Sequence, residues 1–261
     1  MAKVICVANF KGGLGKSSLS TTINAIFNAQ NKGKHKSKSL LIDADGQCNS
    51  TDTYRALTKD VATLYDVILD LDDPLDINEA IQHTEIGDII AADPLLKESD
   101  LKFPNDGNEY FRLKDALEAL SDEYQYVVID TAPADNKLLK NCLIAADKVI
   151  IPITADRYAL QGLSELNKTI QTIKKRSNPG LEIAGLLLVK YKERQTLSKE
   201  VKEALENIAK QMNTKVFKTT IRESVVVPKS QAQRTTLIDF DKNAKVTKDY
   251  IDFVAELMKE V

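Results

Sequence analysis

Short apolar runs alternate along this chain with longer segments in which apolar residues recur every three or four positions. Runs of the length of a buried strand lie at 3–8, 39–43, 86–91, 126–130, 148–153, 183–190 and 215–219. Segments with helical periodicity lie at 19–30, 54–69, 110–120, 138–145, 160–175, 198–212 and 245–259. Strands that alternate with helices predict an α/β fold, a mostly parallel twisted sheet with helices on both faces. Ligands of such sheets lie beyond the carboxyl ends of the strands.

No repeat or break in composition divides the 261 residues, so we expect a single domain that spans 1–261. The chain is 43% hydrophobic and 28% charged, as is typical of globular proteins. No apolar run is long enough to cross a bilayer and the Met1 end has no signal-peptide pattern, so we expect a cytoplasmic location. The formal net charge of −2 gives no overall attraction to DNA, which would have to be bound by a local patch.

A glycine-rich segment, NFKGGLGKSS at 9–18, follows the first apolar run and precedes the first helical segment. Glycines let the backbone wrap closely around a phosphate, and the N–H groups at the start of a helix point at the anion. In this context Lys16 would reach the β- and γ-phosphates of a nucleotide, and the Ser17 hydroxyl would bind Mg²⁺. The predicted phosphate-binding residues are Gly12, Gly13, Leu14, Gly15, Lys16, Ser17 and Ser18.

Two aspartates, Asp43 and Asp45, stand at the end of the second predicted strand. Their D-x-D spacing lets two carboxylates face a metal ion and an attacking water. The alternative, in which both only cap the following helix, stays open. A third aspartate, Asp130, ends the apolar run 126–130 in the Walker B pattern and would hold Mg²⁺ through water. That pattern is common in α/β proteins, and it gains weight here from its place after the other two motifs.

Lys11 is a second lysine, at the start of the loop, that a plain phosphate loop does not need. The doubled lysine matches K-G-G-x-G-K-[ST], the deviant Walker A pattern of the ParA/MinD family, which this chain resembles along nearly its whole length. The resemblance implies that Lys11 also binds ATP, by reaching across a homodimer interface to the phosphates held by the partner chain. Hydrolysis would then depend on dimerisation, as it does where an arginine finger arrives from a second chain.

The resemblance extends to the aspartates, because the family's second signature, D-x-D-P-Q-G-N, aligns with residues 43–49. By that match Asp45 would position or polarise the attacking water, and Asp43 would support the magnesium shell. Gly46 replaces the usual proline and Cys48 the usual glycine, so the backbone of this loop is expected to differ slightly. Ala132 stands where the family commonly has proline after the Walker B strand. None of these departures removes a catalytic group.

Further segments resemble ParA-type partition ATPases, at 64–67, 151–152, 159–162 and 197–201. The resemblance implies non-specific DNA binding by the ATP-bound dimer and a centromere-binding, ParB-like partner that stimulates hydrolysis. Because the chain begins directly at the first predicted strand, it resembles the short form without an amino-terminal DNA-binding domain, and binding to a specific operator is not expected.

Arg194 falls where partition ATPases carry an arginine that contacts DNA, whereas Val226 occupies a second such position and cannot do so. Arg222, Lys229 and Arg234 are the nearby candidates to replace it. Several cations on one face are enough for phosphate contacts, since counterion release supplies the affinity. Surface cations more often form only a solvated face, and this alternative also stays open.

Three related classes fit the sequence less well. A membrane-binding MinD-type protein needs a basic amphipathic tail, but the segment 249–261 is acidic. A nitrogenase-iron-protein-like reductase needs two cluster-binding cysteines per chain, and Cys48 and Cys142 do not lie in matching patterns. A GTPase would normally carry N-K-x-D, which is absent.

ATP with Mg²⁺ is therefore the expected ligand, and ATP-dependent DNA partitioning the expected function. The alternatives are an ATPase that positions a non-DNA cargo and a module that holds ATP without hydrolysing it. The presence of Asp45 disfavours the second alternative.

Overall fold

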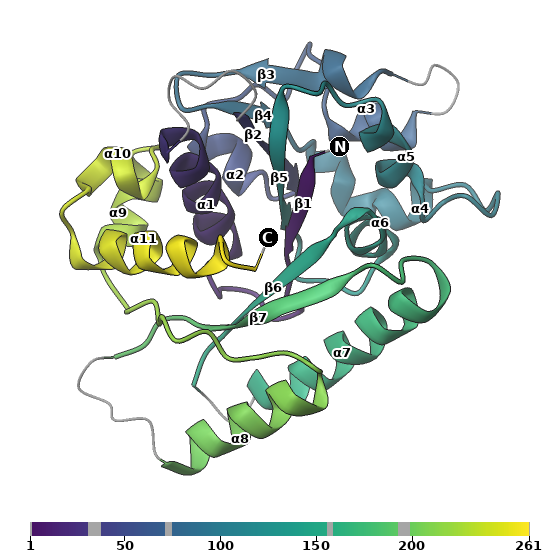
Figure 1. The fold of residues 1–261 in the computed structure, drawn as a ribbon. Helices are drawn as coiled ribbons and strands as arrows, with labels where there is room; N and C mark the ends of the chain where they lie inside the picture. The colour runs from purple at the N-terminus through teal and green to yellow at the C-terminus, as the bar shows by residue number, and fades with distance from the viewer. Residues whose placement is uncertain (1, 31–37, 71–74, 156–158, 193–198, 261) are drawn as a thin grey trace.

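A sheet is the element around which this chain folds (Figure 1). In the computed structural model, which describes residues 2–30, 38–70, 75–155, 159–192 and 199–260, seven strands pair in the order β3-β4-β2-β5-β1-β6-β7. All neighbouring strands are parallel except β3 and β4. The strands are β1 (Lys3–Val7), β2 (Lys38–Ala44), β3 (Ile81–His83), β4 (Asp88–Ile90), β5 (Tyr124–Thr131), β6 (Lys148–Ile153) and β7 (Glu182–Leu188). The predicted fold class is confirmed.

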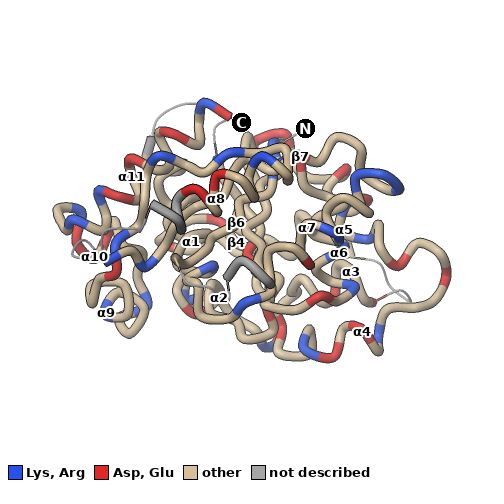
Figure 2. Tube along the Cα trace, turned by 90° about the horizontal axis from the view of Figure 1, so that it is seen from below, with Lys and Arg blue, Asp and Glu red and all other residues tan. Residues whose placement is uncertain are grey.

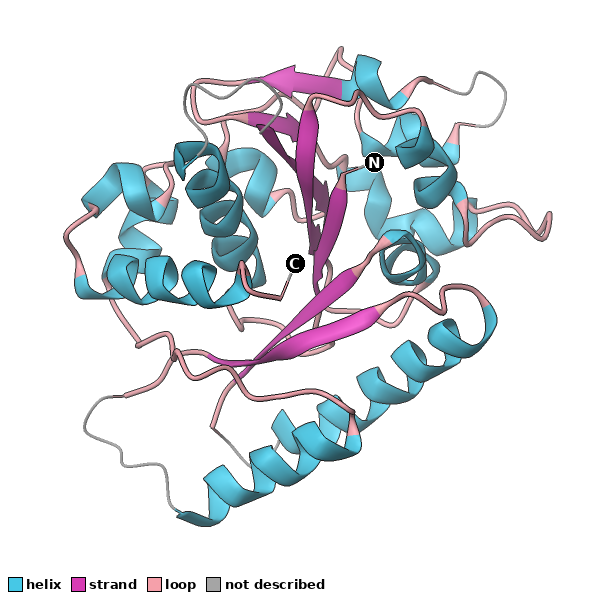
Figure 3. Cartoon of the chain, in the orientation of Figure 1, coloured by secondary structure: helices cyan, strands magenta, loops and turns pink. Residues whose placement is uncertain are grey.

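Helices cover both faces of the sheet (Figures 1 and 3). They are α1 (Lys16–Gln30), α2 (Asn49–Thr53), α3 (Leu64–Leu69), α4 (Ser99–Lys102), α5 (Arg112–Glu118), α6 (Lys137–Ala145), α7 (Ala159–Arg176), α8 (Lys199–Gln211), α9 (Val226–Ala232), α10 (Leu237–Asp241) and α11 (Lys245–Leu257), with the 3-10 helices η1 (Ile77–Ala80) and η2 (Pro94–Glu98). Alternate residues of β1 belong to the two layers. Ile5 is part of the apolar cluster that includes residues of α1, α10 and α11, and Cys6 is part of the cluster that includes residues of α3, α5, α6, α7 and α8. This alternation explains why the parallel strands are apolar throughout.

The carboxyl-terminal helix α11 packs its apolar side, including Tyr250, Phe253 and Leu257, into the layer formed with α1. This packing fits the expectation that the tail docks on the protein rather than on lipid. Among the described helices none is long and apolar enough to cross a membrane.

The predicted helix over 54–69 is wrong in its first half. α2 ends at Thr53, and the chain then turns through two residues with left-handed backbone, Arg55 (φ 55°) and Asp60 (φ 57°), which no helix accommodates. A new helix, α3, starts after Thr63, whose side chain and that of Asp66 form a capping box.

The strand predicted at 215–219 is also wrong, because the segment makes only a single bridge between Val216 and Leu186 of β7. The backbone N–H groups of Lys218 and Thr219 donate to the Glu256 carboxylate of α11, so they are not available to extend a ladder. β3, α2, α4, α9 and α10 were not predicted, since three to seven residues are too few to show a period.

Candidate active site

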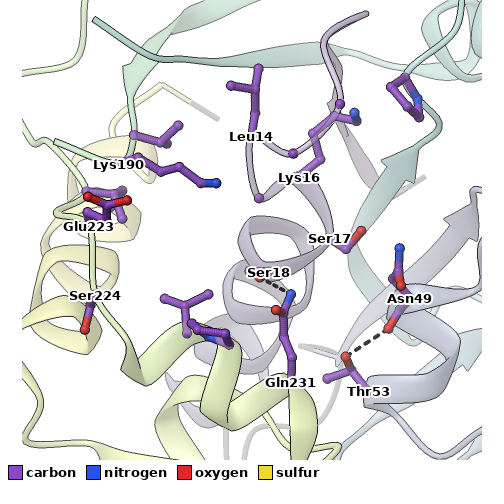
Figure 4. A pocket seen from close by; sticks show the side chains of 18 of the residues that line it. Leu14, Lys16, Ser17, Ser18, Asn49, Thr53, Lys190, Glu223, Ser224 and Gln231 are labelled. Atoms are coloured by element: carbon purple, nitrogen blue, oxygen red, sulfur yellow. Dashed lines mark hydrogen bonds between the residues drawn. The ribbon is translucent and has the colours of Figure 1, made fainter.

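A cavity of about 710 Å³ opens beyond the carboxyl ends of β1, β2 and β5 (Figure 4). Residues 12–18 line one side, and residues of α2 with Asp45 line another. The opposite wall comes from a distant part of the sequence, within 189–190 and 221–231. The predicted phosphate loop thus lies at the predicted edge of the sheet, facing a space large enough for a nucleotide.

Hydrogen bonds to neighbouring strands fix the start of the phosphate loop. Asn9 is buried, and its Nδ2 donates to the Pro152 carbonyl (2.8 Å) while its Oδ1 accepts the N–H of Lys11 (2.9 Å). Gly13 and Gly15 adopt left-handed backbone (φ 72° and 76°) and face open space where a side chain would otherwise stand. These hydrogen bonds and glycine conformations together define the shape of the loop.

Lys16 begins α1 and is 6% exposed, with its side chain at the cavity (Figure 4). Burial lowers the pKa of Lys16 from its usual value, while the charges of Asp130 and Asp45 act in the opposite direction. The first turn of the 15-residue helix α1 contains no acidic side chain that would compete with an anion. This arrangement fits a polyphosphate, since a buried cation and a helix start converge on one point.

Asp43 and Asp130 lie side by side as paired residues of β2 and β5, and both are fully buried. Burial raises the pKa of Asp43, and the charge of Asp130 raises it further. Burial also raises the pKa of Asp130, although hydrogen bonds from Ser17 and Ser50 act against that effect. Two adjacent buried carboxylates beside the Ser17 hydroxyl form an oxygen-rich, negative set of groups that fits Mg²⁺.

The described residues contain no cluster of three His, Cys, Asp or Glu side chains able to hold a metal ion. A site built from one hydroxyl, water and nucleotide phosphate needs no such cluster, because Mg²⁺ retains several waters. The roles of Ser17, Asp43 and Asp130 as metal ligands therefore stay predictions.

Both carboxylate oxygens of Asp43 are engaged in organising the chain that follows. Oδ1 accepts the N–H of Asp45 (3.1 Å), and Oδ2 accepts the N–H and the hydroxyl of Thr51 (both 2.8 Å). Asp45 itself lines the cavity, and its Oδ1 accepts the N–H of Gln47 (2.9 Å). Asp43 thus caps the first turn of α2 and sets the position of Asp45, so the capping alternative describes part of what Asp43 does.

Of the two departures in this loop, the structure explains Gly46 and gives no reason for Cys48. A Cβ on Gly46 would lie 2.8 Å from the backbone nitrogen of Lys97 in η2, so the close approach of η2 favours glycine. Cys48 precedes α2 with left-handed backbone (φ 58°), the conformation that glycine adopts most easily. Its N–H donates to the Asp45 carbonyl (2.8 Å), which closes the turn.

Lys11 is exposed at the rim of the loop, and its Nζ lies 3.5 Å from Thr154 Oγ1. A second chain that covered this rim would meet the Lys11 ammonium directly. Its action across a dimer interface stays a prediction.

The DNA-contact candidates fall in different surroundings. Arg194 lies outside the described residues. Arg222 lines the cavity and binds Asp249 through Nε (2.6 Å) and a terminal nitrogen (2.8 Å), a placement that argues against a DNA contact. Arg234 pairs with Asp52 at the cavity rim. Lys229 is exposed on α9, which suits an electrostatic contact. Basic and acidic positions are interspersed over the helices (Figure 2).

Two hydrogen bonds at the site join residues far apart in the sequence. Gln231 Nε2 of α9 donates to Ser18 Oγ of the phosphate loop (2.8 Å; Figure 4). Ser50 Oγ of α2 donates to Asp130 Oδ2 (2.8 Å). No motif in the sequence identifies Gln231 or Ser50. Ser50 lies within the D-x-D segment, and only that proximity pointed to it.

Known proteins resemble this chain over its whole length. A family model described as an AAA domain matches residues 2–183. The chromosome partitioning protein ParA of Myxococcus xanthus (strain DK1622) is 32% identical over 99% of this chain and 89% of its own.

Two solved structures share the fold. A candidate plasmid partition protein from Borrelia burgdorferi B31, bound to AMPPNP, aligns with a TM-score of 0.79 at 26% identity over 100% of both chains. Cobyrinic acid a,c-diamide synthase from Mycobacterium smegmatis, with a bound ATP analog and magnesium, aligns with a TM-score of 0.80 at 24% identity, over 99% of this chain and 95% of that one. At that identity the synthase shows the fold alone.

The sequence identity to a partitioning protein, the family match and the deviant phosphate loop agree with one another. This chain belongs to the ParA/MinD family of ATPases, on its ParA-type partition branch.

Proposed function

We propose that this protein is an ATP-dependent DNA-partitioning ATPase. ATP would bring two chains together as a sandwich dimer, the dimer would bind DNA without sequence preference, and hydrolysis stimulated by a ParB-like partner would release it. The observation that carries the proposal is the cavity in which Lys16, Asp45 and the helix start of α1 converge, with the exposed Lys11 directly before Gly12 of its lining. The relationship to a chromosome partitioning protein supports the choice of DNA as cargo.

Within the cavity the proposed roles follow from position. The backbone of residues 12–18 and Lys16 would bind the phosphates, and the Ser17 hydroxyl would hold Mg²⁺ with Asp130 behind it. When bound there, Mg²⁺ would supply charge neutralisation for the phosphates. Asp45 faces the same space and would orient the attacking water as a hydrogen-bond acceptor.

Lys11→Ala is expected to separate ATP binding from dimerisation. Because Lys16 and the backbone of residues 12–18 remain, the variant should bind ATP within about threefold of wild type. It should fail to dimerise, because the cation that would contact the partner's phosphates is gone. Light scattering with a non-hydrolysable ATP analogue measures the dimer. The control is Lys114→Ala, which changes an exposed residue of α5, a helix on the other side of the sheet from α1. Equal dimerisation by wild type and Lys11→Ala would exclude the cross-interface role.

DNA binding is expected to require ATP, to ignore sequence and to weaken steeply with salt. Lys229→Ala should reduce affinity about two- to fivefold and lower the salt dependence, while Lys114→Ala should change neither. The measurement is a titration of DNA at several salt concentrations, with and without a non-hydrolysable ATP analogue. Binding that does not depend on nucleotide, or that is confined to one sequence, would contradict the proposed function. ATP-dependent dimerisation without any DNA binding would instead favour a non-DNA cargo.

A further inference from the structure

Consecutive residues of the short helix α2 contact different parts of the active site. The Ser50 hydroxyl donates a hydrogen bond to Asp130 of β5 (2.8 Å). Thr51 donates both its N–H and its hydroxyl to Asp43 of β2 (2.8 Å each). The next residue, Asp52, forms an ion pair with Arg234, which follows α9 (2.6 Å). α2 therefore joins the two buried carboxylates on its inner side to the carboxyl-terminal wall of the cavity on its outer side.

The inner contacts of α2 leave little freedom. Ser50 is fully buried, and Thr51 is 1% exposed, with its Oγ1 also accepting the N–H of Ala92 (2.9 Å). A shift of α2 would therefore change the hydrogen bonds to Asp43 and Asp130 together. The N–H of Asp45 donates to the same Asp43 carboxylate, so the orientation of Asp45 depends on this arrangement as well.

The outer contacts attach α9 to the site at two points. Gln231 of α9 donates to Ser18 of the phosphate loop (2.8 Å). Three residues later Arg234 reaches Asp52, and the Arg234 carbonyl accepts a hydrogen bond from Arg55 Nε (3.3 Å). Gln231 and Asp52 both line the cavity, so these contacts hold its two walls at a fixed separation.

We propose that Asp52 and Arg234 are positioning residues for nucleotide binding and hydrolysis. Their ion pair fixes α9 against α2. The hydrogen bonds of Ser50 to Asp130 and of Thr51 to Asp43 then make the orientation of these two carboxylates depend on the position of α2. The inference rests on the proposed ATPase function. It assigns to Arg234 a role inside the ATPase site rather than on DNA.

The exposure of Asp52 and Arg234 distinguishes a positioning role from a role in the stability of the fold. The side chains of Asp52 and Arg234 are 51% and 60% exposed. An exposed ion pair adds little to the stability of the folded state. Small displacements of catalytic groups, in contrast, have large effects on reaction rates. Loss of the pair should therefore change nucleotide handling with little effect on the melting temperature.

A charge swap tests the proposal. The variants are Arg234→Asp, Asp52→Arg and the double variant that carries both. Dissociation of a fluorescent ATP analogue and amide hydrogen exchange of α2 and α9 in the nucleotide-free protein are measured without DNA. The control is Glu123→Lys, which breaks the similarly exposed Lys38–Glu123 pair (2.9 Å; 52% and 43% exposed) beside the amino-terminal ends of β2 and β5.

Arg234→Asp should speed dissociation of the analogue about two- to fivefold and increase exchange in α2 and α9, and the double variant should recover most of the increase in exchange. Asp52→Arg, alone or in the double variant, also brings a cation to the cavity, so the exchange measurement decides the effect of both variants. Glu123→Lys should change neither readout. The proposal is overturned if Arg234→Asp behaves as wild type, or if the swap recovers nothing. If wild type bound no nucleotide, the proposed function would fail, while the exchange data would still show whether the ion pair holds α2.

Discussion

We expect the variant Lys16→Ala to lose nucleotide binding. Lys16 is almost fully buried and stands where α1 begins, so its charge meets the phosphates away from water. Removing one partner from a buried ion pair costs about 3–5 kcal/mol. That energy corresponds to a loss of about 150- to 4,000-fold in affinity. Titration of a fluorescent ATP analogue, with isothermal calorimetry as a second measurement, determines the dissociation constants.

Two variants make this result interpretable. Lys16→Met keeps most of the side-chain volume, and it should lose binding as completely as Lys16→Ala. Burial lowers the pKa of Lys16, which means that the nucleotide-free protein holds this charge at a cost. Because the charge of Lys16 also stabilises the ionised form of the buried Asp130, the two effects oppose each other and the melting temperature of Lys16→Met should change little. Lys190→Ala, which removes a second lysine at the same cavity, should weaken binding by about fivefold at most because Lys190 is exposed. Binding by Lys16→Ala within threefold of wild type would contradict this assignment.

Local motifs were enough to predict one side of the site. The phosphate loop, the D-x-D pair and Asp130 each follow an apolar strand, and the carboxyl ends of parallel strands meet at one edge of a sheet. The geometry around them, such as the two buried hydrogen bonds from Thr51 to Asp43, involves residues only a few positions away. The spacing of residues close together in the sequence was therefore enough to predict where these groups lie.

The opposite side of the site could not be predicted in the same way. Gln231 meets Ser18 across 213 positions of sequence, and neither residue belongs to a pattern that names its partner. Arg222 was interpreted as a surface cation because its partner Asp249 lies in α11, 27 positions later. A single sequence shows which residues are charged, but tertiary packing decides which of them are neutralised.

The backbone conformation of the loop that carries Asp45 could not be predicted from the sequence either. Gly46 is explained by the backbone of Lys97, which approaches within 2.8 Å of the place a Cβ would take. Arg55 and Asp60 adopt left-handed conformations without being glycine, so the break after α2 had no signal in the sequence. These contacts are set by η2 and by the turn after α2, neither of which has a periodic pattern.

The last prediction concerns Asp45, whose loss should stop hydrolysis while ATP stays bound. Asp45 lines the cavity and is 8% exposed, so its carboxylate acts where water is scarce. Its Oδ1 also accepts the N–H of Gln47, and a change to alanine therefore removes both a reactive group and a structural hydrogen bond. Asp45→Asn separates the two effects, since the amide oxygen can still accept from Gln47.

If the carboxylate orients or activates water, Asp45→Ala and Asp45→Asn should both lose hydrolysis by about 10²- to 10⁴-fold. Both should accumulate as ATP-bound dimers that retain DNA binding, because neither change touches Lys11, Lys16 or Lys229. Single-turnover hydrolysis with the partner protein present gives the rate, and light scattering gives the dimer. Recovery of wild-type hydrolysis in Asp45→Asn would show that Asp45 only supports the loop, and that another group acts on the water.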